Sequence, residues 1–140
     1  MCCDVLVVLY DEIMYLLTTL SEEPVLRIAK LYNELRNDKS RAILEFWSDV
    51  VRMGSPLIES HPDSSKVNVT FVWRGKNAKN IVVFGDFGGS HRPIENMLVQ
   101  IKETDVWYKT YVLPSDSIIA FHFAIDYPLD SLLGTETKPL

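Results

Sequence analysis

Glycine and proline are distributed very unevenly along this chain, and their distribution divides it near Gly54. Residues 1–53 contain no glycine and one proline, whereas all six glycines and the other six prolines lie from Gly54 onward. Both residues interrupt helices, and they supply the special backbone angles that turns require. We therefore expect helices before Gly54 and short strands joined by turns after it.

Three helices are predicted before Gly54, because apolar residues recur there at helical spacing. They cover residues 6–20, residues 21 to about 36, and a stretch with apolar residues from 43 to 51. Ser21 offers a capping hydroxyl at the start of the second helix. That helix is expected to bury Leu26, Ala29, Leu31, Tyr32 and Leu35. Gly54 follows the third helix, where a residue with left-handed backbone angles is common.

From residue 66 onward, apolar residues alternate with the period of two that is typical of strands. Val67, Val69, Phe71 and Trp73 share one face, which we expect to be buried. Further strands are predicted at residues 81–84, 97–101, 106–113 and 119–125. Residues 75–80 are interpreted as a hairpin loop between the first two strands. Short strands with frequent turns favour a mainly β fold, a β-sandwich.

We divide the chain into a helical N-terminal segment, residues 1–53, and a β-sandwich, residues 54–140. The two parts are expected to pack as one unit. A chain of 140 residues with 47% hydrophobic and 24% charged residues suits an ordinary globular domain.

Composition and charge exclude several classes of function. The net charge of −5 argues against nucleic-acid binding, which requires a basic surface. The apolar run at residues 5–10 is too short to span a membrane and lacks the basic start of a signal peptide. Cys2 and Cys3 are adjacent and cannot form a disulfide framework. We therefore predict a cytoplasmic protein that has no nucleic-acid partner and no membrane partner.

The sequence offers no convincing catalytic or metal-binding pattern. The nearest approach to the Gly-x-Ser-x-Gly turn of hydrolases is residues 88–92, Gly-Gly-Ser-His-Arg, which ends in arginine and is followed by Pro93. We interpret Ser90 as an ordinary loop serine. The histidines, His61, His91 and His122, lack the close spacing of metal-ligand pairs. We therefore predict no catalytic residue, no metal ligand and no cofactor in this chain.

Several segments in the later part of the chain follow one another in a specific order. They are Phe46-Trp47, residues 54–59 (Gly-Ser-Pro-Leu-Ile-Glu), residues 69–74 (Val-Thr-Phe-Val-Trp-Arg), residues 105–108 (Asp-Val-Trp-Tyr), Leu113-Pro114 and residues 120–123. In this order and spacing they resemble the N-terminal domain of enterochelin esterases, which are also called iron-siderophore esterases. The resemblance covers roughly residues 46–126.

The resemblance implies an immunoglobulin-like β-sandwich of the E-set type. In the family this domain precedes an α/β-hydrolase domain, which cuts the ester scaffold of a ferric catecholate siderophore with a serine, a histidine and an acid. The chain ends where the hydrolase is expected to begin. The expected function is therefore that of a substrate-side domain in cytosolic iron release, not catalytic alone. Its expected partners are the ferric siderophore and an α/β-hydrolase domain or a second copy of the chain. Ferric iron enters only as part of that substrate.

A ferric tricatecholate complex is a trianion with aromatic faces, so its site needs cationic and aromatic side chains. We predict that the ligand-binding residues are Arg74, Arg92, Trp107, Tyr108 and Lys109. Arg74 ends a strand and Arg92 lies in a glycine-rich loop, two positions from which side chains reach ligands. The alternative for each aromatic residue is a place in the core, where strand aromatics usually lie.

A second interpretation is a non-catalytic glycan-binding or protein-interaction β-sandwich. Glycogen-binding domains of this class carry a Gly-Asp-Phe-Asn turn, often with a tryptophan shortly after. Here residues 85–87, Gly-Asp-Phe, are followed by Gly88 and Gly89, without the asparagine or the tryptophan. The missing aromatic platform weakens the glycan interpretation and leaves the protein-interaction alternative open.

Overall fold

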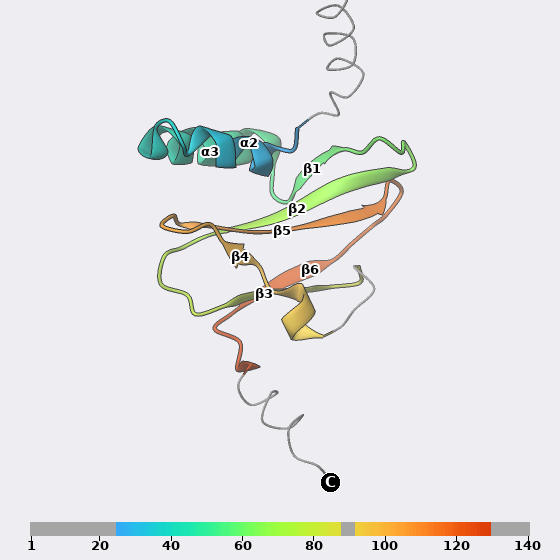
Figure 1. Cartoon of the computed structure of the whole chain (residues 1–140). Helices are drawn as coiled ribbons and strands as arrows, with labels where there is room; N and C mark the ends of the chain where they lie inside the picture. The colour runs from blue at the N-terminus through green and yellow to red at the C-terminus, as the bar shows by residue number, and fades with distance from the viewer. Residues whose placement is uncertain (1–24, 88–91, 130–140) are drawn as a thin grey trace, which may run out of the picture.

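The computed structural model of the chain describes residues 25–87 and 92–129, and these residues form three layers (Figure 1). The helices are α2 (Arg27–Glu34), α3 (Lys39–Met53) and the short 3₁₀ helix η1 (Pro93–Asn96). The strands are β1 (Leu57–Ser60), β2 (Lys66–Arg74), β3 (Ile81–Gly85), β4 (Val99–Gln100), β5 (Val106–Pro114) and β6 (Phe121–Ile125). Helices α2 and α3 lie on one face of the larger sheet, and the smaller sheet lies on its other face.

Both sheets are antiparallel. The larger sheet has four strands in the order β1-β2-β5-β4, and the smaller sheet pairs β3 with β6. The longest pairing joins β2 to β5 and places Thr70 opposite Thr110 and Trp73 opposite Trp107. The prediction of a mainly β sandwich preceded by helices is therefore confirmed.

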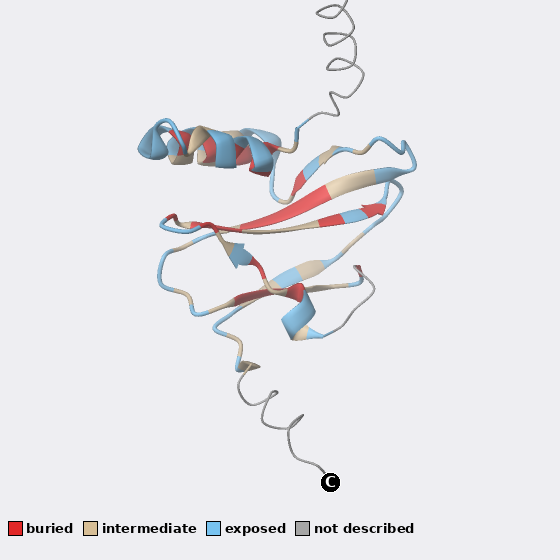
Figure 2. Cartoon of the chain, viewed as in Figure 1, coloured by how far each residue is buried: buried red, intermediate tan, exposed pale blue. Residues whose placement is uncertain are grey.

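Strand β2 is covered on both faces, and it separates two hydrophobic cores. The core between the sheets is built around Phe71, with Val69 and Trp73 on the same face as predicted. The core under the helices includes Phe46 and Val72. Residues 69–72 are consequently all buried, as the continuous buried stretch of β2 in Figure 2 shows. Thr70 is polar but fully buried, and its hydroxyl is 2.9 Å from that of Thr110 on β5.

The ends of α3 show why this helix forms where it does. The Asp38 side chain accepts a hydrogen bond from the backbone N–H of Arg41, which satisfies one donor of the first turn. At the other end, Gly54 has a φ of 99°, an angle that glycine tolerates best. Its N–H donates to the carbonyl of Val50 and closes the last turn. Gly54 therefore ends the helix with a positive φ, as predicted, but its ψ of 163° lies outside the left-handed helical region that was expected.

Two predictions for the part of the chain after Gly54 need correction. Residues 75–80 do not form a hairpin loop, because β2 and β3 belong to different sheets and face each other across the inner core. The strand predicted at 97–101 is reduced to Val99–Gln100, since Met97 leaves the larger sheet to form a bridge with Val82 on β3. Strand β1 and helix η1 were not predicted. The helix predicted at residues 6–20 lies outside the described residues.

Candidate functional site

Arg74, Trp47 and Asp105 form a cluster at the end of β2. The guanidinium of Arg74 lies over the Trp47 ring at 5.4 Å from its centroid, and its Nε donates to Asp105 Oδ2 at 2.9 Å. The indole N–H of Trp47 donates to the other carboxylate oxygen, Oδ1, at 3.0 Å. One carboxylate therefore holds both the cation and the aromatic ring. We call these three residues the Arg74 cluster.

The Arg74 cluster brings together three segments at this end of the larger sheet. Trp47 comes from α3, Arg74 ends β2, and Asp105 directly precedes β5. The Arg74 side chain is 59% exposed, whereas that of Asp105 is 14% exposed. Arginine keeps unused N–H donors when only its Nε is bonded to a carboxylate. The cluster thus presents an oriented, solvent-accessible cation on an aromatic face.

The charge of Asp105 depends on its two donors. Partial burial by itself would raise the pKa of this carboxyl, but the hydrogen bonds from Trp47 and Arg74 outweigh burial and hold the pKa of Asp105 below its ordinary value. Asp105 therefore stays ionised in the folded protein well below neutral pH. A permanent negative charge keeps Arg74 in place over Trp47.

Acid should weaken the fold through Asp105. A carboxyl whose pKa is lower in the folded than in the unfolded chain stabilises the fold above its unfolded pKa of about 3.9, and this contribution is lost as the pH falls further. We expect the urea midpoint of the protein to fall as the pH drops below about 4. Asp105→Asn keeps an acceptor for Trp47 but does not titrate, so its midpoint should fall less. Equal falls in the two proteins would contradict this assignment.

The other predicted aromatic residues have structural partners. Trp107 is only 6% exposed in the core between the sheets, and its indole N–H donates to the carbonyl of Gly75 at 2.8 Å. Trp107 therefore takes the core position that was the alternative for each strand aromatic. Tyr108 lies on the opposite face of β5, where its hydroxyl is 3.0 Å from that of Tyr32 on α2. Partial burial, together with the bond to Tyr108, raises the pKa of Tyr32 to about 12.

The two remaining predicted cations lie apart from Arg74. Lys109 is half-buried, and its ammonium lies 5.6 Å from the centroid of the Tyr111 ring. Arg92 is exposed just before η1, and its carbonyl accepts a bond from the Asn96 side chain. Arg92 follows the far end of β3, whereas Arg74 lies beside the loop that leads into the start of β3. Arg74 combines a mainly exposed side chain with an aromatic ring contact and a bond to a carboxylate.

Sequence reasoning missed one member of the cluster and assigned another only to packing. Asp105 was part of the resembling segment Asp-Val-Trp-Tyr but was not selected, because a single acid before a strand carries no distinctive signal. Trp47 falls in the apolar stretch of the third predicted helix, and it packs against the core under the helices while its ring also supports Arg74. The one usable signal was the presence of Trp47 and Asp105 within the segments that carry the resemblance.

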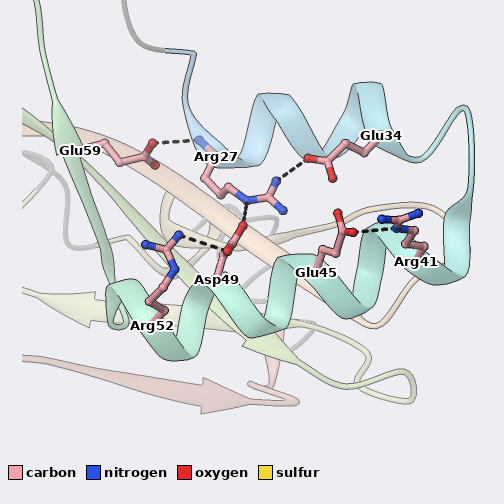
Figure 3. Close-up of polar contacts among 7 residues, drawn as sticks. All are labelled: Arg27, Glu34, Arg41, Glu45, Asp49, Arg52 and Glu59. Atoms are coloured by element: carbon pink, nitrogen blue, oxygen red, sulfur yellow. Dashed lines mark hydrogen bonds and ion pairs between the residues drawn. The ribbon is translucent and has the colours of Figure 1, made fainter.

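A buried arginine holds in position the helical layer that carries Trp47. Arg27 on α2 donates from Nε to Asp49 on α3 at 2.7 Å and from Nη1 to Glu34 at 2.9 Å (Figure 3). Its backbone N–H donates to Glu59 of β1 at 2.9 Å. Its guanidinium also lies over the Phe46 ring at 5.4 Å. Arg27 therefore ties α2 to α3 and to the larger sheet.

No metal centre is present among residues 25–87 and 92–129, in which His, Cys, Asp and Glu nowhere gather in groups that could hold an ion. His61 accepts a hydrogen bond from the backbone N–H of Asp63, and His122 stacks on Phe84. Ser90 and His91 lie outside the described residues. In the same part of the chain, no helix is long and apolar enough to cross a membrane.

The fold defines the class of the protein as a β-sandwich domain with N-terminal helices. The family model described as "Enterochelin esterase, N-terminal" matches residues 68–138, half of the chain. The chain therefore belongs to the enterochelin esterase N-terminal family. The match begins within β2, so residues 46–59, which contributed to the resemblance, lie outside it. Comparisons with curated proteins and with solved structures gave no match.

Proposed function

We propose that this domain contributes a cationic contact to a ferric catecholate siderophore during iron release in the cytosol. An α/β-hydrolase domain, in the same protein or in a partner, would cleave the ester. The observation that carries the proposal is the exposed Arg74 guanidinium, oriented over Trp47 in a member of this family. The domain would bind and position the substrate without cleaving it.

The chemistry of the Arg74 cluster suits a flat, aromatic anion. A guanidinium attracts negative oxygen atoms and also stacks on aromatic faces. Because Asp105 already binds Nε, the terminal nitrogens remain for a ligand. Lys76 and Lys79 are exposed in the loop that follows Arg74, and they add positive charge near the end of the sheet. An incoming anion would therefore meet several cations at this end of the sandwich.

Binding of the anion should depend on Arg74 and on salt. We would titrate the protein by calorimetry with a ferric triscatecholate triester, at low and at high salt. Arg74→Ala should weaken binding about fivefold or more, which corresponds to about 1 kcal/mol. Raising the salt should also weaken binding, because exposed charges are screened. Incubation of the same mixture should release no linear products, since no catalytic group is assigned to this chain.

Arg41→Ala is the matched control. Arg41 is also an exposed arginine paired with a carboxylate, since its Nε donates to Glu45 at 2.8 Å, but it is not stacked on an aromatic ring. Its removal changes the net charge by the same amount and should leave the affinity nearly unchanged. Equal losses of affinity in Arg74→Ala and Arg41→Ala would show that only the net charge of the protein matters, and not the position of Arg74. Salt-insensitive binding of a neutral maltooligosaccharide, with no binding of the anion, would favour the glycan alternative and reject the proposal.

A further inference from the structure

The second half of β5 is an open edge of the larger sheet. Along its whole length β5 pairs with β2 on one side. On its other side β4 pairs only with Trp107 and Tyr108. Figure 1 shows β4 beside the beginning of β5 alone. Among the residues that the structure describes, no strand pairs with residues 109–114 on this side.

The hydrogen bonds around the start of β5 show which residues face the open edge. Asp105 C=O accepts from Gly75 N–H on the β2 side, and Val106 C=O accepts from Ile101 N–H on the β4 side. In an antiparallel strand, the N–H and C=O of one residue point to the same side, and the side alternates along the chain. Thr110 and Val112 therefore direct their backbone groups away from β2. Within the described ranges, no hydrogen bond is formed by these edge-facing groups.

An open groove of about 660 Å³ runs beside this edge. Its lining includes Phe87, Tyr111, Leu113 and Ile119, and among the described residues Asp86 alone brings a charged side chain to it. Two apolar residues beside it face solvent: Val112 is 51% exposed and Ile118 is 99% exposed. Proteins commonly protect edge strands with lysine, proline or a bulge. Pro114 supplies such protection at the end of this edge, whereas Thr110 and Val112 carry none.

We propose that this edge of β5 pairs with the same edge of a second copy of the chain. Such a pairing is self-complementary, because one edge supplies both the donors and the acceptors that its copy requires. It also needs no charged partner. The same contact would cover the apolar side chains of Val112 and Ile118 on both copies.

The bounds of β4 and β5 select one register for this pairing. The strand of the second copy cannot pair beyond Thr110 of the first copy, because β4 already pairs with Tyr108. Strand β5 itself ends at Pro114. Pairing that is centred on Val112 satisfies both limits, because it sets Pro114 of the second copy opposite Thr110. Val112 then exchanges both of its backbone bonds with Val112 of the second copy. Thr110 N–H reaches the carbonyl of Pro114, which already accepts from Ser117 N–H and uses its second lone pair for this bond.

Light scattering after gel filtration would measure this association. The mass is expected to rise from one chain toward two as the concentration increases from about 10 µM to about 1 mM, by mass action. Val112→Pro removes only an edge-facing N–H, so it leaves the hydrogen bonds to β2 intact and should keep the protein monomeric. Val112→Ala trims the same side chain but keeps the N–H, and should still dimerise.

A second variant covers the case in which the proline change prevents folding. Ile118→Lys alters a fully exposed side chain outside the strands, and it should weaken dimerisation about tenfold or more by placing two like charges in the contact. Hydrogen exchange of the Thr110 and Val112 amides should slow as the wild-type protein is concentrated. A single-chain mass at every concentration would overturn the proposal. A dimer that survives both Ile118→Lys and a folded Val112→Pro variant would also overturn it.

Discussion

Replacing Arg27 with alanine is expected to lower the free energy of unfolding by about 3–5 kcal/mol. The Arg27 side chain is 7% exposed, and its guanidinium binds Asp49 and Glu34 while lying over the Phe46 ring. Removing the buried partner of an ion pair costs more than the pair itself contributes, because the partly buried carboxylates lose a cation and the site loses a packed side chain. Arg52 still binds Asp49 at 3.2 Å, so Glu34 is the carboxylate that loses the cation with which it pairs in the structure. Equilibrium unfolding in urea would measure the change.

Arg41→Ala provides the control on the same pair of helices. Arg41 also pairs with a carboxylate, Glu45 on the next turn of α3, but both side chains are exposed to water (Figure 3). Exposed pairs of this kind contribute little to stability. We therefore expect the stability of Arg41→Ala to remain close to that of the wild type. Similar losses in Arg27→Ala and Arg41→Ala would show that burial of Arg27 does not determine its contribution.

The surroundings of Glu59 make the Arg27 prediction more specific. The Oε2 atom of Glu59 accepts the backbone N–H of Arg27, but its Oε1 atom is buried without a hydrogen-bond partner. The Glu59 contact involves only the backbone of Arg27, so a change of the side chain leaves it in place, whereas the bonds to Asp49 and Glu34 are lost. Arg27→Met, which fills space but carries no charge, should therefore remain less stable than the wild type. If the stability of Arg27→Met equalled that of the wild type, packing alone would explain the role of Arg27.

The periodicity of the sequence predicted the strands well but not how they pair. Strands β2 and β5 were found within about a residue of their observed ends because both alternate over a long stretch. The interpretation of residues 75–80 as a hairpin failed because local sequence does not show whether two successive strands pair or face each other. In this fold Phe71 of β2 and Val83 of β3 meet across the core. Long-range packing, not the loop, decides between these arrangements.

Residue type misled the prediction of the buried face of α2. Ala29 and Tyr32 were expected inward, but both are exposed, and Arg27 is buried beside Ile28 instead. Charged residues are rarely buried unless they are paired, and the partners of Arg27 lie 7, 22 and 32 residues away in sequence. No local pattern reveals such partners. The Arg74 cluster has the same property, since Trp47 and Asp105 are 58 residues apart.

Replacing Phe71 with alanine should also cost about 3–5 kcal/mol of stability. Phe71 is fully buried at the centre of the core between the sheets. Its ring stacks on Phe87 at 4.9 Å between centroids and makes edge contacts with Tyr111, Phe121 and Phe123. These contacts come from both sheets, so the truncation would leave a cavity where the sheets meet and would remove several aromatic pairs.

Two further variants calibrate the loss at Phe71. Phe71→Leu keeps most of the buried apolar volume and should cost distinctly less than Phe71→Ala. Val51→Ala, at an exposed position on α3, should change the stability by no more than about 0.5 kcal/mol. Urea midpoints would rank the three proteins, and the near-ultraviolet circular dichroism of Phe71→Ala should lose intensity. If Phe71→Ala were no less stable than Val51→Ala, the two sheets would not depend on this ring for their packing, and the central place given to Phe71 would be wrong.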